Sequence, residues 1–238
     1  LWKKLDDNNQ IYLGNYEGWY SIRDEAFYSE NELIKKDNKF FAPSGAEVEW
    51  LKEESYFFKL SEWQDKLIEY YTINPSAIAP ITRYNEVLSF LKGGLKDLSI
   101  SRTTFKWGVP VPNNDKHIMY VWIDALTNYI TSIGYPDEDN ILFKRYWPGI
   151  HIIGKDILRF HAIYWPAFLL AAGIKPPHRV FGHGWILSGD EKMSKSKGNI
   201  LNPLEIINNY GIDELRYYLM KEVSHGRDGS ISLKNLEN

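Results

Sequence analysis

The stretch from Ile150 to Trp165 reads Ile-His-Ile-Ile-Gly-Lys-Asp-Ile-Leu-Arg-Phe-His-Ala-Ile-Tyr-Trp, and it carries the clearest structural pattern in the chain. Its first four residues form a short apolar run, as in a buried strand. From Asp156 the apolar residues recur every three or four positions, which predicts a buried helix as far as Ala172, kinked at Pro166. Another strand is predicted to begin at Arg179–Phe181. Strand, helix and strand in this order indicate a parallel, right-handed crossover and an α/β fold.

The rest of the C-terminal half fits the same fold class. The apolar run Ile118–Trp122 predicts another strand. Asp124 can cap a helix that runs to about Ile133. Nearer the end of the chain, Asn202-Pro203 supplies an N-cap and a first helical residue, and Asp213–Glu222 predicts a second helix.

Residues 1–98 have a different pattern, with many aromatic residues and glycines at short spacing. Such a pattern predicts short antiparallel strands, and a longer apolar period farther along predicts helices. The expected elements are hairpin strands within 11–22 and 39–51, a helix over 60–71 with Ser61 as its N-cap, and a helix over 83–91 that ends at Gly93-Gly94.

The composition is that of an ordinary globular protein. The 238 residues are 44% hydrophobic and 25% charged, with a net charge of −3, which argues against broad coating of nucleic acid. The absence of cysteine excludes disulfides and cysteine-bound metals. No apolar run reaches the about 20 residues of a membrane helix. The chain begins Leu1-Trp2-Lys3, without a methionine or a signal peptide, so we expect it to be a piece of a longer protein.

The loop Gly189–Asn199 is the strongest candidate for chemistry. Its three lysines alternate with serine, methionine and glycine, directly after a predicted strand and before a predicted helix. Lysine supplies positive charge, serine supplies hydroxyl groups, and glycine lets the backbone approach closely, so the loop suits a polyphosphate. By composition alone, a solvated basic turn remains the alternative.

A second candidate follows the strand at Ile150. Gly154-Lys-Asp156 lies where parallel sheets bind ligands, and a helix N-terminus there favours anionic groups. The Asp156 carboxylate can accept hydrogen bonds from a ribose or an ammonium group, and it can also cap the helix. His161 shares a helix face with Phe160 and Trp165, where a histidine of the core is the alternative.

Several aromatic residues are spaced to form a slot. Trp122, Ala125 and Tyr129 stand at i, i+3 and i+7 and therefore project from one side. Aromatic rings favour a polarizable thioether, and a tyrosine hydroxyl can donate weakly to sulfur. An apolar pocket distinguishes a methylene by only about 1–3 kcal/mol, so polar groups are needed to reject leucine. We expect the slot to be completed by Ile157, Phe160, His161 and Trp165, with an aromatic core cluster as the alternative.

Two motifs resemble those of the class I aminoacyl-tRNA synthetases. Lys192–Ser196 reads Lys-Met-Ser-Lys-Ser, which is the signature loop of that class, and Gly154–His161 fits its Gly-x-Asp-x-x-x-x-His pattern. Further segments, from about residue 11 to residue 230, are similar to the methionyl family of the class. These segments are Gly18–Glu25, Tyr120–Ala125, Gly154–Ile157, Phe181–Trp185 and His225–Gly229.

The resemblance implies a fold, a division of the chain and a function. The fold would be a Rossmann-like parallel sheet, the second half of a class I catalytic domain, with a β-rich inserted connective domain. The parts would be the rear of the connective insertion (1–98), the second half of the Rossmann-type domain (99–190), and the signature loop with the start of a helical stem-contact region (191–238). The function would be ATP-dependent activation of L-methionine and its transfer to tRNA(Met), with ATP and Mg²⁺ as cofactors.

Matched residue by residue, the resemblance implies two sets of site residues. The methionine pocket would contain Trp122, Ala125, Tyr129, Ile157, Phe160, His161 and Trp165, organised with the help of Arg102. The ATP side would contain Asp156, Gly182, His183, Gly184, Lys192, Ser194 and Lys195. Lys192 and Lys195 are the expected catalytic residues, because they would hold the leaving phosphates.

The chain departs from the family pattern in two respects. The connective domain of the family often carries a cysteine-bound zinc, and this chain has no cysteine, so no structural zinc is expected. Aromatic packing by Tyr16, Trp19, Tyr20, Phe27 and Tyr28 is expected in its place. The second class I signature, His-Ile-Gly-His, is also absent, and His151-Ile-Ile-Gly154 only looks similar to it. We expect the first half of the catalytic domain upstream of this chain and the anticodon-binding helices downstream.

Two alternatives to the methionyl interpretation stay open at this point. One is a class I synthetase for leucine, isoleucine or valine, although those enzymes usually carry a large editing insertion. The other is a non-catalytic module that is derived from a synthetase and binds tRNA or a protein. We expect a bacterial cytoplasmic protein, or one of the mitochondrial matrix, that acts without a membrane and is a monomer.

Overall fold

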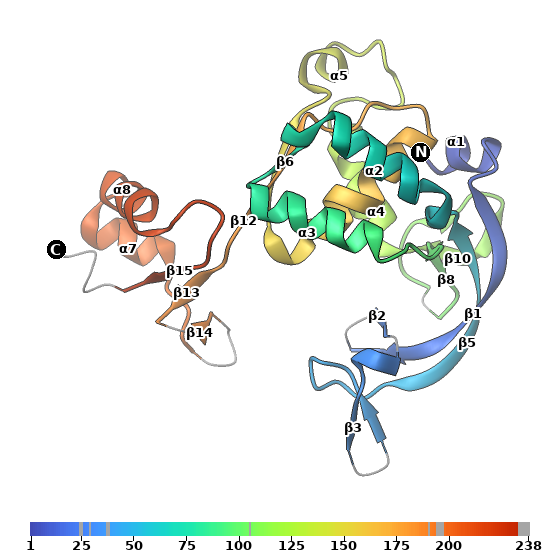
Figure 1. Cartoon of the computed structure of the whole chain (residues 1–238), viewed down its shortest axis with the longest axis horizontal. Helices are drawn as coiled ribbons and strands as arrows, with labels where there is room; N and C mark the ends of the chain where they lie inside the picture. Colours follow the sequence, from blue (N-terminus) through green and yellow to red (C-terminus); the bar gives the residue numbers. More distant parts are fainter. Residues whose placement is uncertain are drawn as a thin grey trace. The chain divides into compact units, whose positions relative to one another are not determined.

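The computed structural model describes residues 1–23, 26–28, 30–36, 39–104, 106–189, 191–193 and 198–232 (Figure 1). Two compact units are formed by interleaved stretches of chain. The first unit contains residues 1–63, 95–143 and 171–173, and the second contains 64–94, 144–170 and 174–238. This division does not follow the boundaries expected at residues 98 and 190, and the three functional regions stay a prediction.

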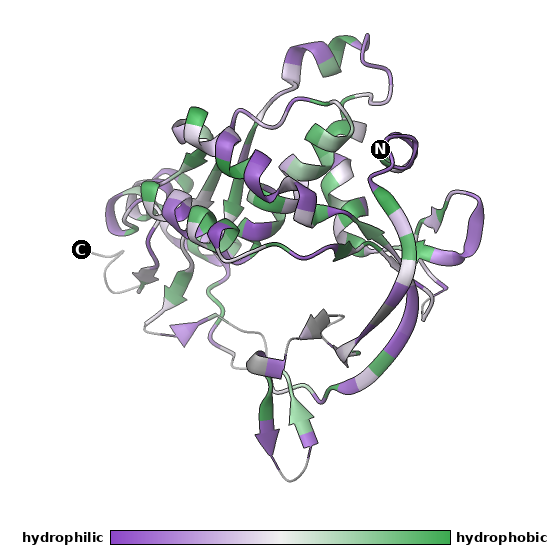
Figure 2. Cartoon of the chain, turned by 45° about the vertical axis from the view of Figure 1, so that its right-hand side comes forward, coloured by the Kyte–Doolittle hydropathy of each residue, from purple (hydrophilic) through white to green (hydrophobic). Residues whose placement is uncertain are grey.

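A long antiparallel ribbon is the main feature of the first unit. β1 (Ile11–Ser21) and β5 (Glu49–Phe58) lie side by side, in register from Ile11 opposite Phe58 to Tyr20 opposite Glu49 (Figure 1). Hydrophilic and hydrophobic bands are seen along the ribbon (Figure 2). The sequence predicted hairpins within 11–22, whereas these residues form one continuous strand. Gly14 lies inside this strand and not in a turn. A Cβ at Gly14 would lie 3.3 Å from the Phe57 ring, so the glycine leaves room for that ring.

Short strands and helices complete the first unit. The strand predicted over Ile118–Trp122 is confirmed only for Ile118 and Met119, which end β10, because α4 already begins at Val121. Tyr120 rather than Asp124 is the N-cap of α4. The elements are α1 (Trp2–Asp7), β2 (Ala26–Tyr28), β3 (Ile34–Lys36), β4 (Lys39–Phe41), β7 (Leu98–Ser99), β8 (Ser101–Arg102), β9 (Pro110–Val111), β10 (Asn114–Met119) and α4 (Val121–Thr131), with α5 (Ile141–Tyr146) beginning in this unit.

Aromatic packing occurs near the tip of the ribbon. Trp19 and Tyr28 pack against a small buried cluster of Ala42, Ala46 and Val48, and the Trp19 ring centroid lies 4.5 Å from that of Phe40. Three other aromatic residues were expected in this role. Tyr20 is buried and lines the cavity beside Arg102 that is described below. The side chains of Tyr16 and Phe27 lie outside the described residues.

The parallel sheet lies in the second unit and confirms the predicted crossover and the α/β class. β11 (Ile150–Gly154) and β12 (Arg179–His183) run parallel, and β6 (Ile78–Ala79) pairs with the other edge of β12. The helices α2 (Gln64–Ile73) and α3 (Ile81–Lys92) pack together, and α3 also packs against β6. Ser61 does not cap a helix as predicted, because it lies within a 3₁₀ turn, Leu60–Trp63, where its N–H and hydroxyl donate to Asp97.

The segment that follows β11 is helical throughout, as the sequence predicts, but it is not one regular α-helix. A 3₁₀ turn (Lys155–Ile157) leads into a π-helical turn (Phe160–Tyr164), and α6 (Trp165–Ala171) continues from there. The irregularity lies directly before Pro166, which has no N–H to donate to the Ala162 carbonyl. The buried Tyr71 hydroxyl donates to that carbonyl at 2.6 Å. The predicted kink at Pro166 therefore takes the form of a wide turn with an external donor.

Beyond β12, a three-stranded sheet and two helices complete the second unit. Asn202 caps α7 by accepting a hydrogen bond from the Leu204 N–H, as the sequence predicted. The elements are β13 (Ile186–Ser188), β14 (Glu191–Lys192), α7 (Pro203–Tyr210), α8 (Ile212–Glu222) and β15 (Gly229–Ile231), with β13 at the centre of its sheet.

Candidate active site

The carboxyl edge of the parallel sheet brings together two of the predicted ATP-side segments. β11 and β12 are in parallel register, with Ile153 opposite Gly182 and Gly154 opposite His183. The chain therefore leaves both strands at neighbouring points, towards Asp156 on one side and Gly184 on the other. Parallel sheets bind their ligands at this edge, so the structure places these residues where the sequence predicted.

Asp156 is held by a tryptophan and does not cap the next helix. The N-cap of the 3₁₀ turn Lys155–Ile157 is Gly154, and no side chain caps it. The exposed Asp156 carboxylate instead accepts a hydrogen bond from the Trp185 indole N–H at 3.3 Å. Gly154 leaves room for this arrangement, because a Cβ there would lie 2.6 Å from Asp156 Oδ1. The expected capping role of Asp156 is therefore wrong, and its carboxylate stays accessible.

Trp185 also contacts three other charged residues at this edge. The ammonium groups of Lys155 and Lys192 lie 4.3 and 3.9 Å from the centroid of its ring. The electron-rich face of an indole attracts such cations. The Trp185 backbone N–H donates to Asp228 Oδ1 at 2.9 Å. One tryptophan thus joins the turn after β11, the strand that begins the lysine loop, and the segment before β15.

Asp228 is the second carboxylate, after Asp156, that contacts Trp185. Its Oδ2 lies 2.7 Å from Lys155 Nζ. That hydrogen bond, together with the one from the Trp185 backbone, lowers the pKa of the Asp228 carboxyl below its usual value. Gly184 lets the two segments approach, because a Cβ at Gly184 would lie only 2.1 Å from the Arg227 carbonyl oxygen. Lys155 and Asp228 therefore form an ion pair beside the turn that carries Gly184.

Lys192 of the predicted lysine loop is fixed by contacts on both its side chain and its backbone, and its carbonyl accepts a hydrogen bond from the Asn199 amide at 3.3 Å. It ends β14 and pairs with Leu187 of β13, so the position of its backbone is set by the sheet. The other two loop residues predicted to bind ATP, Ser194 and Lys195, lie outside the described residues. Of the ATP-side residues, the structure therefore groups Asp156, Gly182–Gly184 and Lys192.

One part of the predicted methionine slot lies on α4 in the first unit. Trp122 and Tyr129 are half-buried and Ala125 is exposed. The adjacent face of the helix, with Ile123, Leu126 and Ile130, is buried. Burial raises the pKa of the Tyr129 hydroxyl, so it stays protonated and able to donate at neutral pH. The spacing thus separates a core face from an accessible aromatic face within this helix.

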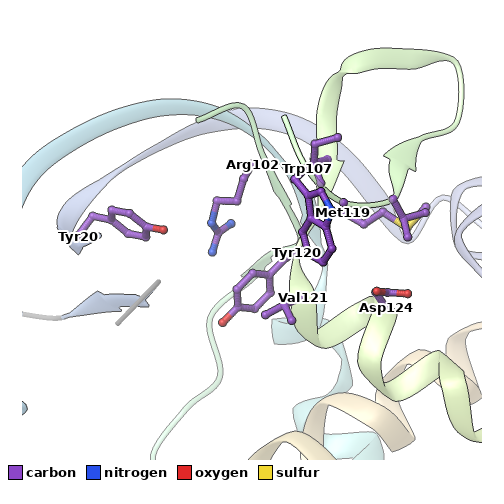
Figure 3. A pocket seen from close by; sticks show the side chains of 10 residues that line it. Tyr20, Arg102, Trp107, Met119, Tyr120, Val121 and Asp124 are labelled. Carbon is purple, nitrogen blue, oxygen red and sulfur yellow. The ribbon is translucent and has the colours of Figure 1, made fainter. Parts of the chain in front are cut away.

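Arg102 lies in the same unit, beside a cavity of about 310 Å³ (Figure 3). Its guanidinium carbon is 4.4 Å from the centroid of the Tyr120 ring, and one of its nitrogens donates to Ser99 Oγ at 2.7 Å. Ser99 in turn is 2.6 Å from Ser55 Oγ, so the arginine is supported by buried hydroxyl groups. The side chain is 5% exposed, which makes it a fixed element of the cavity wall.

The other part of the predicted slot lies in the second unit, on the segment after β11. Ile157 and Phe160 are half-buried, while His161 and Trp165 are buried. His161 Nδ1 is 2.9 Å from the Ile157 carbonyl oxygen, to which it donates. Burial lowers the pKa of His161, so the ring is neutral near pH 7 and Nε2 carries a lone pair. The structure describes this part and the part on α4 separately, and their union in a single slot stays a prediction.

The sequence motifs did not identify three residues of the site, Lys155, Trp185 and Asp228. All three lie inside segments that carry the family resemblance, so a signal was present. No role followed from it, because the contacts join residues that are up to 73 positions apart in sequence. A cation, an indole ring and a carboxylate become a site only when the fold brings them together.

The part of the chain that the structure describes contains neither a cluster of metal-binding side chains nor a helix able to cross a membrane. No group of three or more histidine, aspartate or glutamate side chains lies there in a position to hold a metal ion. Within the same residues, no helix combines the length and the apolar character needed to cross a membrane. The expectation that no structural zinc is present stays a prediction.

Comparison with known proteins gives a consistent answer. The profile of the class I tRNA synthetases (M) matches residues 37–238. A methionine–tRNA ligase of Rickettsia typhi is 56% identical over 237 residues, which is 99% of this chain and 46% of that protein. One from Mesorhizobium japonicum is 58% identical over 233 residues, 98% of this chain and 45% of that protein. The chain thus spans about half the length of the curated relatives that it matches.

Solved structures agree. Mycobacterium tuberculosis methionyl-tRNA synthetase in complex with methionyl-adenylate matches with a TM-score of 0.93 and 53% identity, covering 99% of this chain and 47% of that one. The apo form of the synthetase from the same organism matches with a TM-score of 0.89 and 50% identity, over 99% and 46%.

The parallel sheet, the motifs at its carboxyl edge and these matches define a class I aminoacyl-tRNA synthetase fold. Within that class, the chain belongs to the methionyl-tRNA synthetase family. This membership decides against the alternative of a leucine, isoleucine or valine synthetase.

Proposed function

We propose that the native protein containing this chain activates L-methionine with MgATP to methionyl adenylate and transfers the methionyl group to tRNA(Met). The relatives of this chain are named methionine–tRNA ligases, and the neighbour from M. tuberculosis binds methionyl-adenylate. The observation that carries the proposal is the grouping of Asp156, Gly182–Gly184 and Lys192 at the carboxyl edge of the sheet.

The reaction needs positioned charge rather than an acid or a base. A methionine carboxylate oxygen attacks the α-phosphorus of ATP in line, a new P–O bond forms, and the bond to the bridging oxygen breaks as pyrophosphate leaves. A terminal hydroxyl of the tRNA then attacks the methionyl carbonyl, loses its proton, and displaces AMP. Both steps depend on alignment of the reacting groups and on stabilisation of the leaving oxyanions. Mg²⁺ enters with ATP, as part of the substrate.

The chain offers suitable groups for the nucleotide. The ammonium of Lys192, beside Trp185, would bind the leaving phosphates, and Lys195 would act with it. The accessible Asp156 carboxylate would accept hydrogen bonds from the ribose hydroxyls. The Gly182–Gly184 segment would support this site indirectly, because Gly184 is buried against the backbone of Arg227 and Asp228 and so allows Asp228 to lie beside Lys155.

Methionine would be recognised by neutral aromatic side chains. Trp122, Ala125 and Tyr129 on α4 offer an accessible face, and Ile157, Phe160, His161 and Trp165 offer an apolar wall with one uncharged imidazole. A thioether is neutral and polarizable, so it fits rings without requiring a charged partner. Arg102 would help to organise this region from its buried, hydrogen-bonded position.

The decisive test is methionine-dependent exchange of pyrophosphate into ATP by the native gene product. Loss of one phosphate-binding cation should lower the exchange rate by about 10²–10³, so Lys195→Ala should be nearly inactive. Lys221→Ala is the matched control, because Lys221 is an exposed lysine on α8 and should have no effect. Wild-type exchange in the Lys195→Ala variant would overturn the proposed role of the lysine loop. No exchange in the wild-type protein would favour the non-catalytic module.

The remaining assignments follow from the same proposal. We propose ATP, L-methionine and tRNA(Met) as ligands, a bacterial cytoplasmic location supported by the bacterial relatives, with the mitochondrial matrix as the alternative, and a monomer. The three functional regions, 1–98, 99–190 and 191–238, are proposed as the connective insertion, the second half of the catalytic domain, and the loop with the start of the stem-contact region.

A further inference from the structure

A second buried histidine lies beside His161, and the proposed reaction does not use it. His151 is in the middle of β11 and is 6% exposed, while His161 is 2% exposed. The two ring centroids are 6.1 Å apart and the rings meet edge to face at 74°. A buried polar side chain needs a partner, so the surroundings of His151 indicate what it does.

The partner of His151 is the indole of Trp165. Trp165 Nε1 donates to His151 Nε2 at 3.2 Å, and the Trp165 side chain is fully buried. An indole has one polar group and it can only donate, so its orientation depends on where the acceptor is. Trp147 packs against both residues, with ring centroids 5.9 Å from His151 and 6.1 Å from Trp165. The position of the Trp165 indole is therefore fixed by its hydrogen bond to His151 and by packing against Trp147.

The hydrogen bonds also define the protonation of the two histidines. Because His151 Nε2 accepts from Trp165, the His151 proton is on Nδ1. His161 donates from its own Nδ1 to the Ile157 carbonyl. Burial lowers the pKa of both rings, that of His151 to about 4, and a charge on His161 would lower the pKa of His151 further. The His151 and His161 rings are therefore both uncharged near neutral pH.

We infer that His151 is a specificity-determining positioning residue: through its hydrogen bond to Trp165 and its edge contact with His161, it orients the two side chains proposed to contact methionine. The inference rests on the proposed function, which makes Trp165 and His161 part of the methionine-binding wall. His151 itself touches no substrate. Its effect should therefore be on methionine binding and not on ATP binding.

The test compares two substitutions in the native gene product by methionine-dependent pyrophosphate exchange. His151→Leu removes the acceptor and leaves a buried indole N–H unpaired, whereas the amide oxygen of His151→Gln can still accept. We expect His151→Leu to raise the KM for methionine about tenfold, with kcat and the KM for ATP within about twofold. His151→Gln should restore the KM for methionine to within about threefold. His178→Leu, at an exposed histidine of the same unit, should change nothing.

Two outcomes would overturn the inference. One is an unchanged KM for methionine in His151→Leu. The other is an equal loss in every kinetic parameter in both variants, as expected of a purely structural residue. If His151→Leu does not fold, His151→Asn takes its place, because its amide is too short to reach the indole and should behave like leucine rather than like glutamine. An equal KM for methionine in His151→Asn and His151→Gln would count against the inference.

A spectroscopic readout reports on the hydrogen bond itself. The indole ¹⁵N–¹H resonance of Trp165, identified by its disappearance in Trp165→Phe, should move in His151→Leu and move less in His151→Gln. An unmoved resonance in His151→Leu would refute the hydrogen bond. This experiment and the proposed function can fail separately. Absence of exchange in the wild-type protein would overturn the proposed function, whereas wild-type exchange with an unaffected His151→Leu variant would overturn only this inference.

Discussion

Gly184 packs directly on the main chain of the segment that carries Asp228. A Cβ at Gly184 would lie 2.1 Å from the Arg227 carbonyl oxygen and 2.5 Å from the Asp228 nitrogen. Backbone atoms cannot move aside as the end of a side chain can. Gly184→Ala should therefore separate the two segments and lower the free energy of unfolding by about 3 kcal/mol or more, measured by urea denaturation.

Gly189 provides the matched control for that prediction. Its φ is +62°, and a Cβ there would meet no atom of the described residues within 4 Å. Asparagine tolerates the left-handed region, so Gly189→Asn should change the free energy of unfolding by no more than about 1 kcal/mol. Equal effects of the two substitutions would show that close packing at Gly184 is not what the site requires.

Trp185 offers a second prediction at the level of single residues. Its ring lies within 4.3 Å of two ammonium groups, and a cation–π contact contributes about 0.5–2 kcal/mol. Trp185→Leu should therefore raise the KM for ATP by roughly three- to thirtyfold in pyrophosphate exchange. Trp185→Phe keeps an aromatic face and should show a smaller effect. If both variants lose affinity equally, the ring face does not position Lys155 and Lys192.

The sequence predicted where the residues of a single motif lie in the fold. It did not predict the contacts of those residues with other segments of the chain. The placement of Asp156 and Gly182–Gly184 at one sheet edge could be predicted, because parallel strands align their carboxyl ends. The contacts of Trp185 could not, because they depend on how β12, β13 and β15 return to the same place. The capping role of Asp156 failed for a related reason: the nearby indole competes for the carboxylate.

Among the elements, the segment after β11 owes its shape to Pro166 and to a donor from another helix. The Tyr71 hydroxyl gives Ala162 a hydrogen bond of 2.6 Å, where a regular helix would supply a backbone N–H. Tyr71→Phe should leave this buried carbonyl short of a donor and lower the free energy of unfolding by about 1–3 kcal/mol. Chemical denaturation of the native protein measures the change.

Tyr70→Phe is the comparison for Tyr71→Phe. Tyr70 is the neighbouring residue on α2, and its ring lies 5.1 Å from that of Tyr71. It is only half-buried, so loss of its hydroxyl should cost less than about 1 kcal/mol. A Tyr71→Phe effect no larger than that of Tyr70→Phe would mean that the carbonyl of Ala162 does not depend on Tyr71.

Periodicity predicted β11 and β12 of the parallel sheet correctly, did not predict β6, and extended the strand that ends at Met119 into the start of a helix. Residues 118–122 form an apolar run too short to distinguish strand from helix, and α4 begins inside it at Val121. The ribbon of β1 and β5 shows the converse error, because glycines suggested turns within 11–22, whereas Gly14 lies inside β1 and leaves room for the Phe57 ring of β5. That contact joins residues far apart in sequence, so the local pattern did not reveal it.

At the scale of the whole molecule, the buried histidines make stability depend on pH. The pKa of His151 is about 4 in the folded chain against 6.5 for an ordinary histidine, and that of His161 is lowered as well. Between about pH 6.5 and pH 4 the unfolded chain therefore binds protons that the folded chain does not. The contribution is fully present above pH 6.5 and is lost as the pH falls to about 4.

From His151 alone, the free energy of unfolding should be about 2 kcal/mol lower at pH 5 than at pH 7, measured by urea denaturation. His161 acts in the same direction. The lowered pKa of Asp228 acts only at more acidic pH, outside this window. His151→Gln cannot titrate, so its dependence on pH should be flatter, and a slope equal to that of the wild type would contradict the assignment.

The short pairing of β13 with β14 sets a limit on how this sequence can vary in length. Leu187 pairs with Lys192 and Ser188 with Glu191, and successive residues of a strand face opposite sides. Insertion or deletion of one residue between Ser188 and Glu191 would turn Lys192 away from Trp185, although every amino acid of the motif would still be present. Substitutions elsewhere in the hairpin leave that geometry intact. In functional descendants of this sequence, the spacing from Trp185 to Lys192 should therefore be preserved even where the intervening residue types are not.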